Sequence, residues 1–175
     1  MSEAAHETPL KGGALAITAF ALAMGTFTQV LDTTIANVSL PTIAGDLGAS
    51  TDQSTWIITA FVVANGIGVP LTGWLMSRYG VVKVFVVSML GFTIASLLCG
   101  IAWSLESLVF FRTLQGALSG PIIPGSQALM LSIFPHNRRT TALAIWSITT
   151  LVAPICGPLL GGYRSEERRV GKECG

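Results

Sequence analysis

The sequence predicts an all-α integral membrane protein with five transmembrane helices. Of its 175 residues, 51% are hydrophobic and 11% are charged, less than half the charged share of an ordinary soluble domain. The charges are also unevenly placed, because they leave several long stretches that contain none. A bilayer core of about 30 Å needs roughly 20 apolar residues of helix, and in lipid each segment must satisfy its own backbone hydrogen bonds. Charge-free stretches of this length therefore favour spanning helices.

Each helix is placed by one such stretch. The expected helices are residues 13–38, 54–76, 81–102, 106–131 and 140–162. The first follows a leader, residues 1–12, that carries Glu3 and Glu7. Its apolar run is too long for a secretory signal and no small-residue cleavage site follows it, so we expect a retained helix. The second and fifth contain no charge, the third contains Lys83, and the fourth contains Glu106 and Arg112.

The basic residues predict the orientation. Apart from Arg112 and the last twelve residues, they lie at alternate connections: Lys11, Arg78, Lys83, Arg138 and Arg139. The connections at residues 39–53 and 103–105 contain no Lys or Arg. Because cytoplasmic loops are enriched in Lys and Arg, we expect a multi-pass membrane protein with residues 1–12 in the cytoplasm.

The last twelve residues, 164–175, do not fit this pattern. They hold four of the ten basic residues, on the side that otherwise has none. A natural charged loop is one explanation. The string RSEERRVGKEC, however, resembles the translation of a sequencing adapter, so we expect residues 164–175 not to belong to the natural protein.

Two charged side chains lie inside the expected helices, Asp32 and Arg112. Each would cost about 2.5–3.5 kcal/mol at a helix centre. Asp32 lies six residues before the outer end of its helix and Arg112 six residues after the outer start of its own. At 1.5 Å per residue, both lie roughly 9 Å below the outer surface. An ion pair between them, direct or through water, is expected if the two helices are neighbours, and snorkelling towards the interface is the alternative.

Glycine and proline interrupt the fourth and fifth helices. Residues 116–124 combine Gly116 and Gly120, four apart, with Pro121 and Pro124. Small residues four apart allow close helix contact, and proline permits a kink. The fifth helix contains Pro154, Gly157, Pro158, Gly161 and Gly162. This spacing is equally consistent with tight packing and with a pliable helix at a moving interface.

Several other classes of protein are not supported. The net charge of +1 gives no basic surface for nucleic acid, and the three cysteines form no CxxC pair for a metal. A membrane-embedded enzyme would need a catalytic cluster, but HExxH and GxSxG are absent and His6 and His136 lie at a terminus and in a loop. No phosphate-binding loop indicates ATP. We therefore expect no enzyme, metal or cofactor.

Four motifs resemble those of the major facilitator superfamily, in its branch of drug:proton antiporters with fourteen spanning helices. Residues 31–41, LDTTIANVSLP, resemble LDxTIxNVALP at the end of helix 1. Residues 73–83, GWLMSRYGVVK, resemble the loop 2–3 signature GxLaDrxGrkr, with Ser77 in place of the usual Asp. Residues 112–116, RTLQG, resemble the helix 4 motif, and residues 153–162, APICGPLLGG, resemble the antiporter motif of helix 5.

The resemblance implies a secondary active transporter of the bacterial inner membrane that exports hydrophobic or amphipathic drugs in exchange for protons. It implies proton coupling by Asp32 and Arg112, and places Asn37 and Gln115 at the substrate cavity. For Gln115, contact with substrate or water and a packing hydrogen bond are both open. The implied cytoplasmic loop motif comprises Gly73, Arg78, Gly80 and Lys83, and the antiporter motif comprises Pro154, Gly157, Pro158, Gly161 and Gly162.

Five helices are fewer than the six of a half-unit in this superfamily. We therefore expect an incomplete N-terminal half, inactive alone, whose partners are the lipid bilayer, protons and small hydrophobic substrates. In a Gram-negative source, the resemblance also implies a periplasmic adaptor protein and an outer-membrane channel. A uniporter or a metabolite symporter on the same scaffold is the alternative function.

Overall fold

The structure is a computed structural model that describes residues 13–46 and 51–173, with side chains except at 39–44, 46, 51–52, 54 and 157–173. The predicted cytoplasmic segment, residues 1–12, lies outside the described residues. Within the described ranges the chain forms helices joined by short connections, and no strand. The predicted all-α class is confirmed.

The first three helices follow the predicted order. They are α1 (Gly13–Asp46), α2 (Thr51–Tyr79) and α3 (Val81–Gly100). The first is eight residues longer than the predicted 13–38. Within the described side chains its apolar span covers Gly13–Val38.

The predicted helix at 106–131 is divided in two, which corrects the prediction of one continuous helix. The structure has α4 (Leu105–Ser119) and α5 (Ile122–Ile133), separated by Gly120 and Pro121. Pro121 has no N–H for the carbonyl of Ala117, and its ring crowds the preceding turn. Gly120 and Pro121 keep right-handed helical dihedral angles, with φ of −49° and −73°, so the interruption is a local break.

The last helix begins after a short 3-10 turn, η1 (His136–Arg138), and is α6 (Arg139–Glu173). The helix includes residues 164–173 of the segment that we expect not to belong to the natural protein. The origin of that segment stays a prediction. Among the described residues, four helices are long and apolar enough to cross a membrane: α1, α2, α3 and the segment His136–Cys156. The segment of the other predicted crossing forms α4 and α5, whose 15 and 12 residues are each fewer than a span needs. That this segment crosses the membrane stays a prediction.

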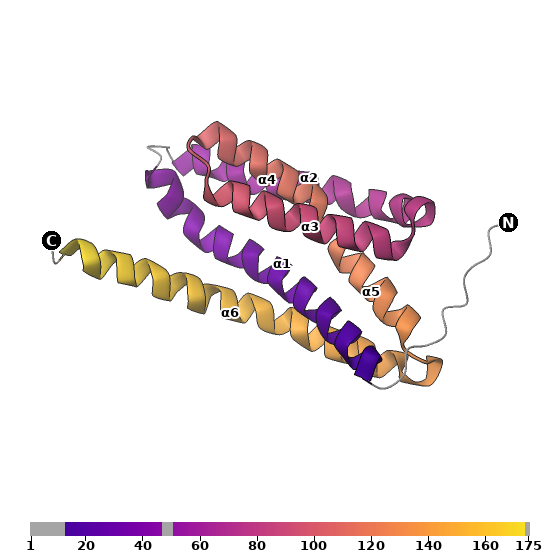
Figure 1. The fold of residues 1–175 in the computed structure, drawn as a ribbon. Helices are drawn as coiled ribbons and strands as arrows, with labels where there is room; N and C mark the ends of the chain where they lie inside the picture. Colours follow the sequence, from indigo (N-terminus) through magenta and orange to yellow (C-terminus); the bar gives the residue numbers. More distant parts are fainter. Residues whose placement is uncertain (1–12, 47–50, 174–175) are drawn as a thin grey trace.

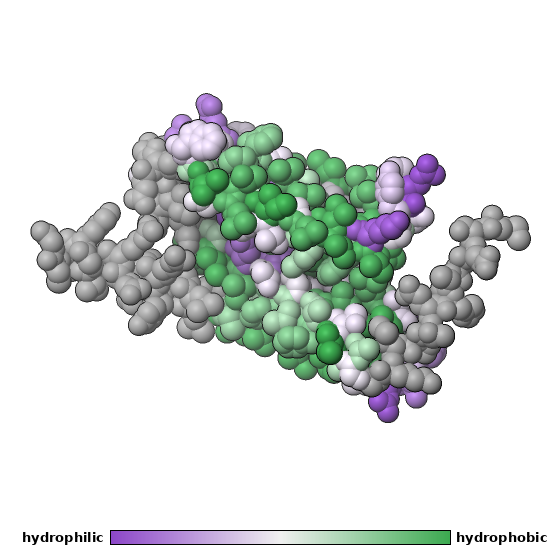
Figure 2. All heavy atoms as spheres, viewed as in Figure 1, coloured by the Kyte–Doolittle hydropathy of each residue, from purple (hydrophilic) through white to green (hydrophobic). Residues whose placement is uncertain are grey.

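The connections gather at two opposite ends of the bundle (Figure 1). The start of α1, the α2–α3 turn and the α5–α6 connection lie at one end. That end carries Arg78, Lys83, Arg138 and Arg139, all of them predicted to be cytoplasmic. Figure 2 shows hydrophilic residues at both ends of a hydrophobic belt, as expected for a bundle that crosses a bilayer.

Two helix pairs dominate the packing, α2 with α4 and α1 with α6. The first depends on glycine. A Cβ atom at Gly116 would meet the backbone carbonyl of Phe61, and one at Gly120 would come within 2.6 Å of the carbonyl carbon of Gly68. These glycines therefore permit backbone contact between α2 and α4. The apolar core comprises Leu22, Phe61, Phe85, Phe92, Ile122, Met130, Ile133, Ala142 and Trp146.

Candidate functional site

The two intramembrane charges meet in one polar cluster. The Nη1 atom of Arg112 lies 4.0 Å from the Oδ2 atom of Asp32. The contact joins α4 to α1, as the matching depths of the two residues in the sequence predict. A hydrophilic area is visible between α1 and α3 within the hydrophobic belt (Figure 2).

Neutral side chains make the short contacts to Asp32. The Nε2 atom of Gln115 donates to Oδ2 at 2.7 Å, and the hydroxyl of Ser96 donates to Oδ1 at 2.7 Å. Arg112 donates from Nη1 to the Oε1 atom of Gln115 at 2.9 Å. The guanidinium is therefore connected to the carboxylate through the amide of Gln115, with a longer direct ion-pair contact beside it.

Burial differs sharply across this cluster. Gln115 is fully buried and Arg112 is 8% exposed, whereas 26% of the Asp32 side chain is exposed. An arginine buried in low dielectric needs a nearby negative charge or strong acceptors, which Asp32 and Gln115 supply. The Asp32 carboxylate is therefore more exposed than the two side chains of α4 that it faces.

Three further members of this region were not predicted from the sequence. Ser96 and Cys99 both lie on α3, and the thiol of Cys99 contacts the Oε1 atom of Gln115 at 3.7 Å. Gln29, one turn before Asp32 on α1, is 5% exposed, and its Oε1 atom has no hydrogen-bond partner among the described residues. Small residues are common where membrane helices pack. The residue types of Ser96 and Cys99 therefore did not identify them as members of a polar cluster.

The other residues of the predicted cavity and loop motif lie apart from the cluster. Asn37 is exposed on α1, just over one turn beyond Asp32. Gly73 is exposed, and a Cβ atom added there would meet no atom within 4 Å. Arg78 and Lys83 are exposed at the α2–α3 connection. Gly80 has φ of +87° in that turn, a conformation that favours glycine. Its place in the motif thus has a structural reason.

The predicted antiporter motif lies on α6. Pro154 is exposed. From residue 157 onward the structure describes only the backbone, so the side chain of Pro158 lies outside the described part. Gly157, Gly161 and Gly162 are within the helix by their backbone. The resemblance also implies that these residues shape a helix that seals the transporter against leak, and this role stays a prediction.

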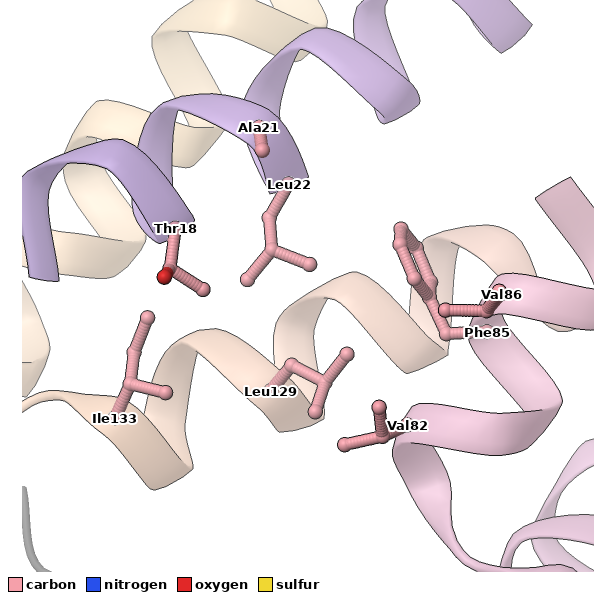
Figure 3. Close-up of a pocket in the computed structure, with 8 residues that line it drawn as sticks. All are labelled: Thr18, Ala21, Leu22, Val82, Phe85, Val86, Leu129 and Ile133. Atoms are coloured by element: carbon pink, nitrogen blue, oxygen red, sulfur yellow. The ribbon is translucent and has the colours of Figure 1, made fainter. Parts of the chain in front are cut away.

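A separate apolar cavity of about 300 Å³ lies between α1, α3 and α5. Figure 3 shows side chains from the three helices around it. Its lining residues are Thr18, Ala21, Leu22, Val82, Phe85, Val86, Leu129 and Ile133. It contains no member of the polar cluster, and none of its lining residues is charged. No group of His, Cys, Asp and Glu that could hold a metal ion is found among the described residues.

Comparisons with known proteins agree with the membrane fold. The family model for the Major Facilitator Superfamily matches residues 22–166. A solved structure of a bacterial homolog of the human lysosomal transporter Spinster, inward-facing and unoccupied, has a TM-score of 0.77 and 21% sequence identity. The match covers 88% of this chain and 32% of that one. At this identity the likeness shows the fold.

Sequence relatives are considerably more similar. The multidrug export protein EmrB of Haemophilus influenzae is 58% identical over 158 residues, covering 90% of this chain and 31% of that protein. EmrB of Escherichia coli strain K12 is 55% identical over 166 residues, which cover 95% of this chain and 32% of that protein. The fatty acid resistance protein FarB of Neisseria gonorrhoeae is 56% identical over 157 residues, which cover 90% of this chain and 31% of that protein. The chain thus spans about a third of the length of these relatives.

Proposed function

Because the chain belongs to the Major Facilitator Superfamily, we propose that it is the N-terminal part of a proton-coupled exporter of hydrophobic or amphipathic drugs and toxic compounds. Identities of 55–58% to multidrug export proteins support export. They favour it over the uniporter or metabolite symporter that the scaffold alone would also allow.

The observation that carries the proton-coupled mechanism is the environment of Asp32. A carboxylate inside a membrane segment is costly, and here it is retained by two hydrogen bonds and a nearby guanidinium. Its partial exposure leaves a route for a proton. Protonation removes the negative charge opposite Arg112, so each proton bound or released changes the electrostatic balance between α1 and α4.

Gln115 transmits this change in the proposed mechanism. Its amide donates to Asp32 and accepts from Arg112, so a weaker bond to a neutral carboxyl group also changes the position of the guanidinium. Drug and proton would then bind alternately at a site near the membrane centre, while helix bundles rock around it. Asn37 would face the substrate path. The glycines and prolines of residues 154–162 would shape the helix that seals the transporter against leak.

We also propose the orientation and the assembly. The basic end of the bundle, with Arg78, Lys83, Arg138 and Arg139, faces the cytoplasm of a bacterium, in the inner membrane. The opposite end then faces the periplasm, where an adaptor protein and an outer-membrane channel would receive the exported compound. The lipid bilayer, protons and small hydrophobic substrates complete the set of partners.

The test is ethidium efflux by the full-length transporter in cells that lack other exporters. Addition of a protonophore should abolish the efflux, because the proton gradient drives it. A metabolite symporter would not export ethidium. A uniporter would move ethidium only down its own electrochemical gradient and could not export it against that gradient. Either result would contradict the proposal.

A further inference from the structure

We propose that Asp32 carries its proton on Oδ1 and that Ser96 of α3 is the positioning residue that accommodates it. This inference rests on the proposed function, in which Asp32 is the proton-binding group. It assigns the proton to one oxygen atom and gives α3, which contributes no charge to the cluster, a part in the coupling.

The two carboxylate oxygens have different partners. Oδ2 accepts from the Nε2 atom of Gln115, and Oδ1 accepts from the hydroxyl of Ser96, both at 2.7 Å. An amide NH₂ group donates and cannot accept, whereas a hydroxyl can do either. A proton on Oδ2 would face a donor, so only the Oδ1 side has a partner that can change its role.

Arg112 fixes the amide of Gln115 in this orientation. The Oε1 atom of Gln115 accepts from Nη1 of Arg112 at 2.9 Å and is also contacted by the thiol of Cys99. A flipped amide would turn its NH₂ group towards the guanidinium, placing two donors together. Because arginine keeps its charge in proteins, Gln115 remains a donor to Oδ2 in both protonation states of Asp32.

Protonation of Asp32 rearranges the hydrogen bonds of Ser96. A hydronium ion gives its proton to Oδ1, an O–H bond forms there, and water leaves. The new carboxyl O–H donates to the Oγ atom of Ser96, whose own hydrogen rotates to the carbonyl of Phe92 one turn earlier on α3. The neighbouring Thr93 donates to its own helix in the same manner, to the carbonyl of Met89 at 2.9 Å. Proton release reverses both steps.

The charged groups around Asp32 are few. From α4 it faces Arg112, and from α3 the nearest titratable group is Cys99. α5 contains no charged residue. The charged residues of α2 and those at the start of α6 lie at helix ends, and the titratable side chain farther along the described part of α6 is Cys156. Ser96 is thus the neutral partner on Oδ1 among the contacts described.

The test is a pH titration of the Asp32 carboxyl group in the full-length transporter in lipid nanodiscs. The C=O stretching band of the protonated group is followed by infrared difference spectroscopy and identified by its loss in Asp32→Asn. Ser96→Ala removes the hydrogen bond of both forms, and the bond to the charged form is the stronger, so the midpoint should move up by about one pH unit, a tenfold change in proton affinity. Ser96→Thr keeps the hydroxyl and should restore the midpoint. The carboxyl band should also shift in frequency in Ser96→Ala, because its hydrogen-bond acceptor is gone.

The matched control is Ser88→Ala, the same change about two turns away on α3, with thermal unfolding measured for every variant. An unchanged midpoint and band in a folded Ser96→Ala variant would overturn the inference, and so would an equal shift in Ser88→Ala. Ethidium efflux is measured separately. A protein that shows the expected titration but no protonophore-sensitive efflux would retain the Ser96 assignment and lose the proposed function.

Discussion

Gln115 is the residue on which the polar cluster depends most. It is fully buried and joins Arg112 to Asp32 through hydrogen bonds at 2.9 and 2.7 Å. The sequence left two roles open for Gln115, a packing hydrogen bond and contact with substrate or water. The structure shows hydrogen bonds to Asp32 and Arg112. Contact with substrate remains a proposal.

Replacing Gln115 with Leu keeps a side chain of similar size but removes both hydrogen bonds. A hydrogen bond to a charged group contributes about 1.5–3 kcal/mol, so we expect proton-driven ethidium efflux to fall about tenfold or more. Thr113→Val is the control, because Thr113 is exposed on the same helix and bonds to the carbonyl of Val109. Wild-type efflux from Gln115→Leu would show that the bridging amide is dispensable.

The sequence predicted the pairing of Asp32 and Arg112 but not its geometry. Residue counting places both at one depth, because the rise of a helix is constant. The rotation of each helix depends on packing against its neighbours, so counting does not show that Gln115 lies between the charges. For the same reason, the sequence did not distinguish Ser96 and Cys99 from the other small side chains between positions 81 and 100.

At the scale of the elements, glycine determines which helices touch. A Cβ atom at Gly68 would come within 2.8 Å of the carbonyl oxygen of Ala117, the oxygen that Pro121 leaves without a helical N–H partner. The close α2–α4 contact and the break after Ser119 therefore occur together. The sequence showed a kink at Gly120 and Pro121, but it did not show that the helix would divide there.

Gly116→Ala should destabilise the protein, because its Cβ atom would meet the backbone of Phe61. Overpacking of this kind costs about 1–3 kcal/mol, so the unfolding temperature of the full-length transporter should fall. Gly66→Ala is the matched control on α2, because no atom lies within 4 Å of the Cβ position there. Equal unfolding temperatures for the two variants would contradict the proposed helix contact.

At the scale of the whole molecule, the charges separate the two ends of the bundle. The predicted cytoplasmic residues Arg78, Lys83, Arg138 and Arg139 lie together at one end (Figure 1). This agreement was predictable, because connections of helices that each cross the bilayer must alternate between its sides. Which end faces the cytoplasm is a proposal that labelling can test.

Single cysteines at Asn137 and Trp103, in a cysteine-free background, should react on opposite sides. A membrane-impermeant maleimide added to intact spheroplasts should label Trp103→Cys and spare Asn137→Cys, since these exposed residues lie at opposite ends of the bundle. Inside-out vesicles should give the reverse pattern. Labelling of Asn137→Cys in spheroplasts would contradict the orientation.

The 175-residue chain should not transport by itself. It spans about a third of the length of its curated relatives, and many large apolar side chains on its helices are exposed, among them Ile17, Phe20, Ile67 and Leu97. Reconstituted in liposomes, the chain alone should show no gradient-driven ethidium flux beyond that of empty liposomes. Proton-dependent flux from the chain alone would refute this.

The central claim is that Asp32 couples proton movement to export, and the most direct test is Asp32→Asn in proteoliposomes. The full-length variant and the wild type are compared in two assays, ethidium accumulation driven by an imposed pH gradient and gradient-free ethidium exchange. The account predicts that Asp32→Asn loses the gradient-driven accumulation and keeps the exchange. Accumulation at the wild-type level in Asp32→Asn would contradict the account.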